Sequence, residues 1–183
     1  MIIGLTGTFA SGKDTIADYL VKEKGFEAIG LGDIVREYVK KYNWPNTREA
    51  QQKMGNKLRD EHGADFLMRE AIKRTKSKNV VIAGVRQPKE ADFLKETDGA
   101  YLISVDAPIE MRMERIIKRD RPGDPKSLAE LKEKEDKEMN AKFESANCQN
   151  ISYCIKKADF TVINDGTISE LNKKTADILT RLN

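Results

Sequence analysis

The sequence predicts an α/β protein, a three-layer α/β/α arrangement built on a five-stranded parallel sheet. Five short apolar runs alternate with amphipathic runs of helical length along the 183 residues. A glycine-rich segment of the form G-x-x-x-x-G-K, Gly7 to Lys13, joins the first apolar run to the first amphipathic run. Because no repeat or low-complexity linker interrupts this pattern, we expect a single domain over residues 1–183 with a helical insert.

The five predicted strands are short segments of apolar and β-branched residues. Such segments, bounded by glycine or polar residues, are typical of strands that are buried on both faces of a parallel sheet. The clearest of them is Asn79 to Ala83, which has the sequence NVVIA. The five segments are 1–5, 27–31, 79–83, 100–105 and 159–163.

The predicted helices are identified by apolar residues at helical spacing and by residues that favour helix ends. Gly25 suits a C-cap, and Thr47 and Ser127 suit N-caps. Pro88 and Pro108 suit the first turn of a helix. The segments expected to be helical are 12–24, 33–42, 48–61, 64–76, 88–96, the run after 108, the run after 127, and 168–182.

Two of these helices carry further expectations. In the helix after Pro108, the apolar residues that should face inward include Ile117. In the helix after Ser127, Glu138 and Lys142 stand at i, i+4, and further pairs of opposite charge have the same spacing. This charged run predicts a solvated face.

Composition and charge limit the classes of function. A net charge of +3 is too small to indicate nucleic-acid binding, and the basic stretch Arg69 to Lys78 contains no aromatic residue. No apolar run reaches the roughly 18 residues that a membrane-spanning helix needs, so we expect no membrane partner. Cys148 and Cys154 fit neither a disulfide framework nor a zinc pattern, which favours a reducing, cytoplasmic location.

The segment from Gly7 to Thr15 has the residues of a phosphate-binding loop. Its glycines allow the backbone to wrap so that successive N–H groups point at phosphate oxygens, and the helix that follows adds its positive N-terminal end. Lys13 would place a charge between the β- and γ-phosphates. The residues expected to bind a nucleotide in this loop are Gly7, Thr8, Ala10, Ser11, Gly12, Lys13, Asp14 and Thr15.

The ends of the other predicted strands carry charged residues, at the edge of the sheet where ligands bind in such folds. Arg86 follows a strand closely, and its fork suits an acceptor phosphate, with an ion pair as the alternative. Asp33 is either an ordinary N-cap or a ligand of an acceptor hydroxyl or a metal-bound water. Arg36, one turn later, would share the acceptor pocket.

Arginines are dense after the fourth predicted strand. Arg112, Arg115 and Arg119 share one helix face, and Arg121 begins a loop rich in proline and glycine. Fixed guanidinium groups stabilise the charge of a transferring phosphoryl group, and a mobile loop that carries them can close and exclude water. The alternative is a set of surface ion pairs with glutamates of the same helix.

Together these motifs resemble the P-loop nucleotide kinases of the nucleoside monophosphate kinase superfamily. The segments Gly12 to Thr15, Gly32 to Arg36 and Gly84 to Arg86 are similar to the phosphate-loop, acceptor and arginine motifs of that superfamily. Over nearly the whole chain the sequence looks closest to a branch of dephospho-CoA-kinase-like nucleotide kinases. That likeness includes the arginine spacing over 112–121 and the turn from Asn164 to Gly166.

The resemblance implies a kinase that uses ATP and Mg²⁺ and phosphorylates a small nucleotide-type acceptor. It implies a helical acceptor-binding insert over about 33–77 and a short lid over about 119–145, and it assigns Arg36 and Arg86 to the acceptor. The residues that would act in catalysis are Lys13, Asp33, Arg86, Arg119 and Arg121. Beyond the loop, the residues that would contact ATP are Arg115, Asn164 and Gly166.

Two positions depart from the family pattern. Asp14 stands where the loop usually has Ser or Thr, and Ala83 stands where relatives often have an Asp that helps to hold the metal. Mg²⁺ would then be held mainly by phosphates and waters, with Asp14 or Asp106 acting through water.

The sequence leaves the acceptor open. A monophosphate acceptor is already ionised and needs no general base, whereas a ribose hydroxyl, as in dephospho-CoA, would make Asp33 the candidate base. A GTP- or ATP-binding switch is a further class, but the nearest match to a guanine-reading motif, Asn172 to Thr175, lacks its terminal aspartate. A monomer and a homodimer are both compatible with the sequence.

Overall fold

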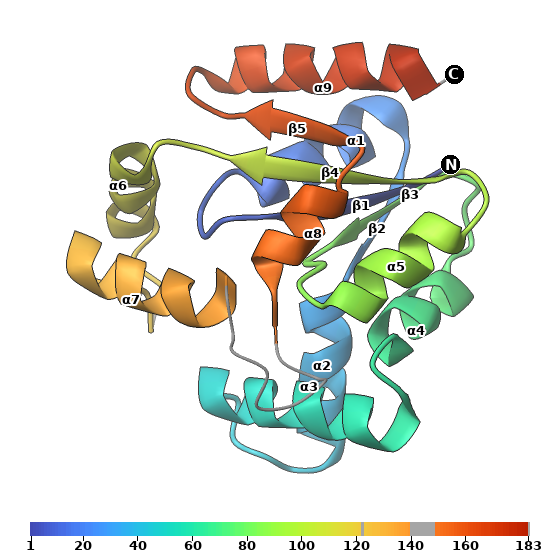
Figure 1. Cartoon of the computed structure of the whole chain (residues 1–183), viewed down its shortest axis with the longest axis vertical. Helices are drawn as coiled ribbons and strands as arrows, with labels where there is room; N and C mark the ends of the chain where they lie inside the picture. The colour runs from blue at the N-terminus through green and yellow to red at the C-terminus, as the bar shows by residue number, and fades with distance from the viewer. Residues whose placement is uncertain (122, 140–148, 183) are drawn as a thin grey trace.

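The computed structural model describes residues 1–121, 123–139 and 149–182. Its strands are β1 (Ile2–Gly7), β2 (Glu27–Gly30), β3 (Val80–Ala83), β4 (Ala100–Asp106) and β5 (Phe160–Ile163). They form one parallel sheet in the order β2–β3–β1–β4–β5 (Figure 1). β1 is central, and its Ile2 lies opposite Val80 on one side and Ala100 on the other. The five predicted strands are therefore confirmed.

Helices cover both faces of this sheet (Figure 1). One face packs against α1 (Lys13–Lys24) and α9 (Ile168–Leu182). The other face packs against α5 (Pro88–Glu96) and α8 (Ile151–Lys157). The three-layer α/β/α class is confirmed.

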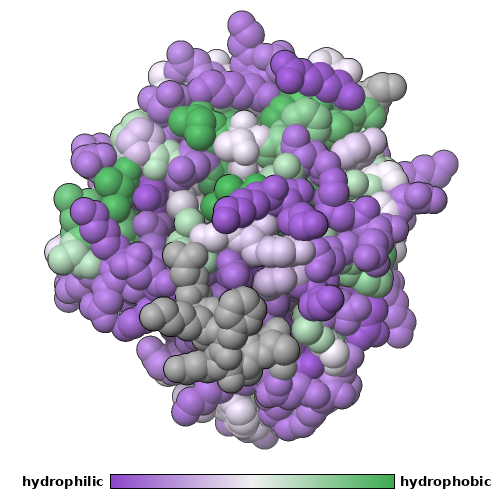
Figure 2. All heavy atoms as spheres, viewed as in Figure 1, coloured by the Kyte–Doolittle hydropathy of each residue, from purple (hydrophilic) through white to green (hydrophobic). Residues whose placement is uncertain are grey.

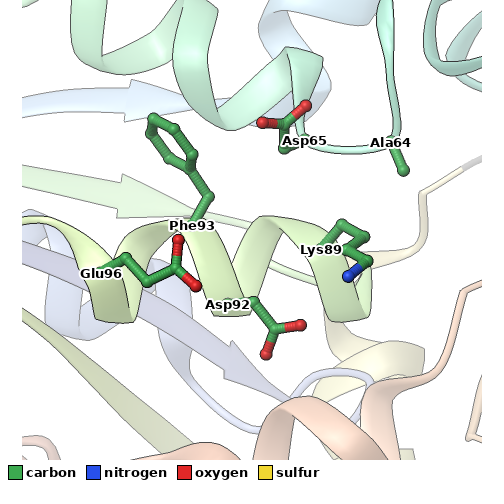
Figure 3. Close-up of a pocket in the computed structure, with 6 residues that line it drawn as sticks. All are labelled: Ala64, Asp65, Lys89, Asp92, Phe93 and Glu96. Atoms are coloured by element: carbon green, nitrogen blue, oxygen red, sulfur yellow. The ribbon is translucent and has the colours of Figure 1, made fainter.

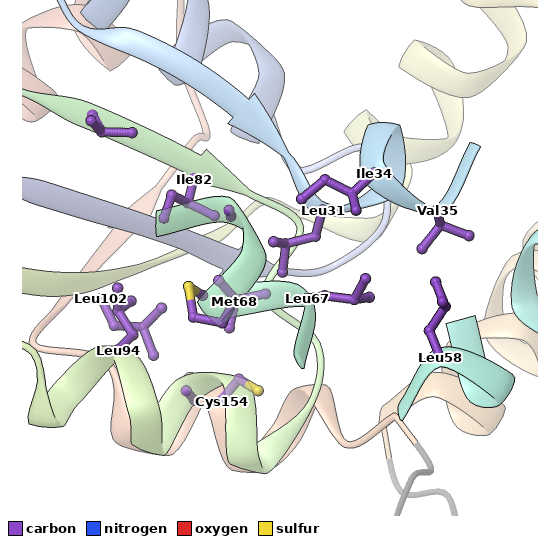
Figure 4. Close-up of a cluster of buried hydrophobic side chains, with 14 of the residues drawn as sticks. Leu31, Ile34, Val35, Leu58, Leu67, Met68, Ile82, Leu94, Leu102 and Cys154 are labelled. Atoms are coloured by element: carbon purple, nitrogen blue, oxygen red, sulfur yellow. The ribbon is translucent and has the colours of Figure 1, made fainter. Parts of the chain in front are cut away.

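The side-chain alternation of the strands produces two apolar cores. In β3, Val80 and Ile82 point into one core, while Val81 points into the other. Figure 4 shows part of the first core, in which Leu102 and Cys154 lie near the side chains of α5. The other cysteine, Cys148, lies outside the described residues.

Three helices between β2 and β3 occupy the part of the chain expected to form the insert. They are α2 (Leu31–Lys41), α3 (Arg48–His62) and α4 (Phe66–Arg74). All three pack on one another and contribute to the core of Figure 4. Thr47 caps α3 as predicted, because its hydroxyl accepts a hydrogen bond from the Ala50 N–H at 3.2 Å.

α6 (Ile109–Arg119) and α7 (Leu128–Met139) follow β4 and pack on each other beside the loop that follows β1. Ser127 caps α7 as predicted, with its hydroxyl accepting from the Glu130 N–H at 3.2 Å. The prediction that Ile117 faces inward is wrong, because its side chain is 63% exposed. The buried residues of α6 are Arg112, Met113 and Ile116.

Some predictions miss the structure or lie outside it. α8, a helix of seven residues, is not among the predicted helices. It is capped by Asn150, whose side-chain oxygen accepts from the Tyr153 N–H at 2.9 Å. Lys142, expected to pair with Glu138, lies outside the described residues. So do residues 122 and 140–145 of the predicted lid.

The visible surface is mostly hydrophilic, with apolar residues in separate patches (Figure 2). Among the described residues, no helix combines the length and the apolar character needed to cross a membrane.

Candidate active site

A cleft of about 760 Å³ lies at the carboxyl ends of β1, β2 and β3. The loop after β1 forms one wall, α2 and α3 form another, and residues of α6 and α7 complete it. Arginines from several separate elements share this cleft. They are Arg36, Arg48, Arg59, Arg86, Arg115, Arg119 and Arg121.

The loop between β1 and α1 is wrapped tightly, and two of its glycines are required by close contacts. Gly7 has φ +131°, and a Cβ there would lie 2.0 Å from the Val105 carbonyl oxygen. Gly12 has φ +106°, and a Cβ there would lie 2.3 Å from the Asn164 amide nitrogen. Both positions therefore exclude a side chain, as a phosphate-binding loop requires.

Lys13 folds back over the loop that precedes it. Its ammonium donates to the carbonyl oxygens of Gly7 at 3.0 Å and Thr8 at 2.5 Å, and to the Ser11 hydroxyl at 3.2 Å. Burial, followed by repulsion from the nearby Arg86 guanidinium, lowers the pKa of Lys13 to about 8. An anion in the cleft would reverse this effect and favour the charged ammonium.

Residues that end or follow β4 and β5 fix the position of the loop by hydrogen bonds. The Thr8 hydroxyl donates to the Asp106 carboxylate at 2.7 Å. The Asn164 amide donates to the Ser11 carbonyl at 2.8 Å, and the Arg115 guanidinium donates to the Asn164 carbonyl at 3.0 Å. These hydrogen bonds tie the loop to the carboxyl ends of β4 and β5.

Arg112 has a structural role, which its position in the row of arginines on α6 does not predict. It is buried and donates to the carbonyl oxygens of Ala107 at 2.8 Å and Phe9 at 3.3 Å. It also forms an ion pair with Glu135 of α7, and the same carboxylate accepts the Phe9 N–H at 3.1 Å. A carboxylate thus binds a backbone N–H of the loop.

Arg119 and Arg48 meet at the aromatic ring of Phe9. Each guanidinium carbon lies over that ring, 5.0 Å from its centroid. Arg119 also makes a bidentate ion pair with Asp124, at 2.6 and 2.9 Å. Phe9, in the loop after β1, therefore contacts both Arg48 of α3 and Arg119 of α6.

Arg86 and Arg48 converge on one carboxylate. Glu138 accepts from the Arg48 guanidinium at 2.6 Å and from the Arg86 guanidinium at 3.3 Å. The expectation that Glu138 belongs to a solvated face is wrong, since its side chain is only 18% exposed. In this structure Arg86 makes an ion pair, the alternative to a contact with an acceptor phosphate.

A buried ion pair supports the position of Arg86. Glu90 of α5 accepts from the Arg59 guanidinium at 2.8 and 3.2 Å. Its other oxygen accepts the N–H groups of Arg86 and Gln87, both at 3.3 Å. The insert and the strand end that carries Arg86 are therefore joined through one carboxylate.

Asp33 and Arg36 pair with each other at the mouth of the cleft. Asp33 is 64% exposed and does not line the cleft, whereas Arg36 does. The interpretation of Asp33 as an N-cap is wrong, because Gly30 occupies that position and Asp33 lies in the first turn of α2.

The cleft brings together most of the residues expected to act on a nucleotide. The predicted residues that line it are Ala10, Ser11, Gly12, Lys13, Asp14, Thr15, Arg36, Arg86, Arg115, Arg119 and Arg121. The predicted residues that do not line it are Gly7, Thr8, Asp33, Asp106, Asn164 and Gly166. Of these, Thr8, Asp106 and Asn164 fix the loop instead. Within the described residues, no three of His, Cys, Asp or Glu are grouped so as to hold a metal ion by themselves.

One face of α3 lines the cleft, and the motifs in the sequence do not predict it. Its members recur at three- and four-residue spacing and are mostly polar: Arg48, Gln51, Gln52, Gly55 and Arg59. The spacing was visible in the sequence, but a polar stripe on a helix is more often a solvated face.

A second hollow, of about 370 Å³, lies between the start of α4 and α5 (Figure 3). Its lining includes Asp65, Asp92 and Glu96 against one lysine, Lys89. Asp92 accepts a hydrogen bond from the Tyr153 hydroxyl at 2.7 Å. None of the residues expected to bind a nucleotide lines this hollow.

Comparison with known proteins identifies a family and relatives that match most of the chain. A family model described as an AAA domain matches residues 3–142. A UPF0200 protein of Pyrococcus abyssi is 30% identical over 190 residues, which cover 100% of this chain and 97% of that protein. A UPF0200/UPF0201 protein of Archaeoglobus fulgidus is 30% identical over 188 residues, and the chain spans only 55% of its length.

Among solved structures, a shikimate kinase from Bacteroides thetaiotaomicron superposes with a TM-score of 0.64 at 14% identity, covering 98% of each chain. A likeness at this identity shows that the two chains share a fold.

Proposed function

We propose that this chain is an ATP-dependent phosphotransferase acting on a nucleoside or deoxynucleoside monophosphate. The chain belongs to the AAA domain family and to the UPF0200 proteins. The observation that carries the proposal is the convergence of arginines from the insert, the end of β3 and α6 on one cleft that faces the phosphate loop. A site with this much fixed positive charge favours two phosphorylated substrates bound side by side.

The loop after β1 would bind the donor. One of its N–H groups, that of Phe9, already donates to the Glu135 carboxylate, so this donor can also serve a phosphate oxygen. ATP bound there with Mg²⁺ would supply the transferable phosphoryl group and neutralise part of its charge. Lys13 would exchange its contacts with loop carbonyls for phosphate oxygens, and Arg115 is held beside the loop at Asn164.

Magnesium would be held mainly by phosphate oxygens and waters. Asp14 is exposed in the first turn of α1, next to Lys13, and can contact a metal-bound water. Asp106 uses one carboxylate oxygen for both Thr8 and the Ala107 N–H, which leaves its second oxygen to a water of the metal shell.

Arg36 and Arg86 would bind the acceptor phosphate. Both line the cleft, and their elements follow β2 and β3. Arg119 and Arg121 would stabilise the transferring group, with Arg119 held in place by Asp124 and the Phe9 ring.

The alternative acceptor is the ribose hydroxyl of dephospho-CoA, for which Asp33 would be the base. The geometry supports the monophosphate instead, because Asp33 is exposed, is paired with Arg36 and lies outside the cleft lining. A switch that binds ATP or GTP would not require arginines beyond those near the donor.

A panel of acceptors tests the proposal. Protein, ATP and Mg²⁺ are mixed with each ribo- and deoxynucleoside monophosphate, with dephospho-CoA and with shikimate, and ADP formation is measured against an acceptor-free control. We expect at least one monophosphate to raise the rate about tenfold or more. Stimulation by dephospho-CoA alone would overturn the monophosphate proposal, and Asp33→Asn would then test the base.

Two variants separate phosphoryl transfer from other causes. Lys13→Ala should abolish transfer, while Lys22→Ala, an exposed lysine of the same helix, should leave it unchanged. ADP formation that no acceptor stimulates would favour a nucleotide-dependent switch. Equal turnover in Lys13→Ala and the native protein would contradict the donor site.

A further inference from the structure

α7 presents two carboxylates to the two anion-binding parts of the cleft. Glu135 binds the Phe9 N–H of the loop and the guanidinium of Arg112. Glu138, one turn later, joins the guanidinium groups of Arg48 and Arg86. Residues at i and i+3 lie on the same helix face, so the two carboxylates stand side by side.

We propose that Arg48 joins Arg36 and Arg86 in binding the acceptor's phosphate, and that Glu138 is an internal anion which the acceptor displaces. This inference rests on the proposed phosphotransferase function and names a residue, Arg48, that the family resemblance does not assign. It also defines the substrate class as an acceptor that carries its own phosphate group.

The location of Arg48 supports this assignment. Its guanidinium lies over the ring of Phe9, a residue of the phosphate loop, and it lines the same cleft as Lys13. A phosphate held by Arg48 would therefore lie next to the donor site. Transfer requires this proximity, because the reacting atoms must approach to about 3–3.5 Å.

The charges favour exchange of the internal carboxylate for a phosphate. Glu138 supplies one negative charge to two guanidinium groups, whereas a phosphate monoester supplies about −1.5 to −2 at pH 7 and three acceptor oxygens. Arg48 is also 41% exposed, and ion pairs that solvent reaches contribute little to stability. A dianion can thus replace Glu138 without unfolding α7.

The arrangement also differs from an ordinary charged helix surface. Elsewhere on α7, Glu133 pairs with Lys137 at i, i+4, and both side chains are exposed. Glu138 instead turns toward arginines 90 and 52 residues away in sequence. Glu133 therefore provides a matched control on the same helix.

The first test measures anion binding without catalysis. Inorganic phosphate is titrated at constant ionic strength into the native protein, Glu138→Gln, Glu133→Gln and the double variant Arg48→Gln with Glu138→Gln, and binding is followed by NMR. We expect Glu138→Gln to bind phosphate about tenfold more tightly than the native protein, and Glu133→Gln to bind it equally. The gain should disappear in the double variant.

Two results would overturn the inference. One is unchanged phosphate affinity in Glu138→Gln. The other is a gain that persists when Arg48 is also replaced, because a general change in charge would produce that result. Circular dichroism and thermal unfolding of each variant show whether the fold is intact.

The second test uses a monophosphate that the acceptor panel identifies. Arg48→Gln should raise its KM about tenfold with little change in kcat, and Arg48→Lys should recover part of the loss. A fall in kcat alone would contradict a binding role. If no acceptor is turned over, the proposed function fails while the phosphate titration still decides the anion site; if transfer succeeds but Glu138→Gln changes nothing, only this inference fails.

Discussion

The carboxylate of Glu90 is completely buried and accepts two hydrogen bonds from the guanidinium of Arg59, at 2.8 and 3.2 Å. Arg59 is itself only 8% exposed. The pair joins α3 to α5, and the second oxygen of the same carboxylate accepts the Arg86 N–H. The position of Arg86 therefore depends on an ion pair that is almost completely buried.

Removal of one partner should destabilise the protein strongly. In Glu90→Leu the Arg59 charge would remain buried without compensation, and we expect the free energy of unfolding to fall by about 3–5 kcal/mol. Urea denaturation measures this change. Glu96→Leu, at an exposed position of the same helix, should change the unfolding free energy by less than about 0.5 kcal/mol.

The double variant Arg59→Met with Glu90→Leu should be more stable than Glu90→Leu alone, because apolar side chains of similar volume can replace a buried ion pair. A double variant that is no more stable than the single one would mean that the cost does not come from the unpaired charge.

Two glycines with positive φ should respond differently to alanine. Gly7→Ala would place Cβ 2.0 Å from the Val105 carbonyl oxygen, and we expect a loss of about 3 kcal/mol or more, because the backbone on both sides must move. Gly25 has φ +70° with nothing within 4 Å of its Cβ position. Gly25→Ala should therefore cost only about 1–2 kcal/mol of conformational strain. Equal losses in urea denaturation would contradict the crowding at Gly7.

Nucleotide binding should depend on pH through Lys13. Its pKa is lowered from 10.5 to about 8, because burial and Arg86 disfavour the charged form. A bound phosphate favours the ammonium, so ATP affinity should fall as pH rises through about 8, and binding near pH 8.5 should take up a proton. Calorimetry in two buffers with different ionisation enthalpies measures this uptake.

Lys13→Arg is the control for this pH effect, because a guanidinium stays charged throughout the range. The slope of affinity against pH above 8 should disappear in that variant, even if its affinity is lower overall.

The lowered pKa of Lys13 also affects the stability of the fold. Between pH 8 and 10.5 the unfolded chain binds more protons at Lys13, so this group should make the native protein more stable as pH rises.

The ring of Phe9 should contribute to phosphoryl transfer, because it contacts Arg48 of α3 and Arg119 of α6. Phe9→Leu removes the surface on which Arg48 and Arg119 stack, and we expect kcat/KM for phosphoryl transfer to fall roughly fivefold to tenfold, which corresponds to about 1 kcal/mol. Phe9→Tyr keeps an aromatic face and should stay close to the native value. Equal effects of leucine and tyrosine would argue against the stacking role.

Local signals account for what the sequence predicted. The strands and the caps at Thr47 and Ser127 depend on residues near one another in the chain, and the structure confirms these elements. α8 was missed because seven residues with two aliphatic side chains give little periodicity. Its cap, Asn150, was the one available signal.

The partners of charged residues were not predictable in the same way. Glu138 has lysines at helical spacing, and nothing local shows that it turns instead to Arg48 and Arg86. Arg112 belongs to a regular row of arginines, but the tertiary fold buries it against the carbonyl of Phe9. Such contacts join distant segments, and only the three-dimensional arrangement determines them.

The central position of β1 has a consequence for synthesis of the protein on the ribosome. The loop after β1 is made before Asp106 and Asn164, yet Thr8 is held by Asp106 and Ser11 is held by Asn164. A nascent chain that ends before these residues cannot build the loop as it stands in the folded protein. The loop can therefore take its folded form only after the chain through Asn164 has been made.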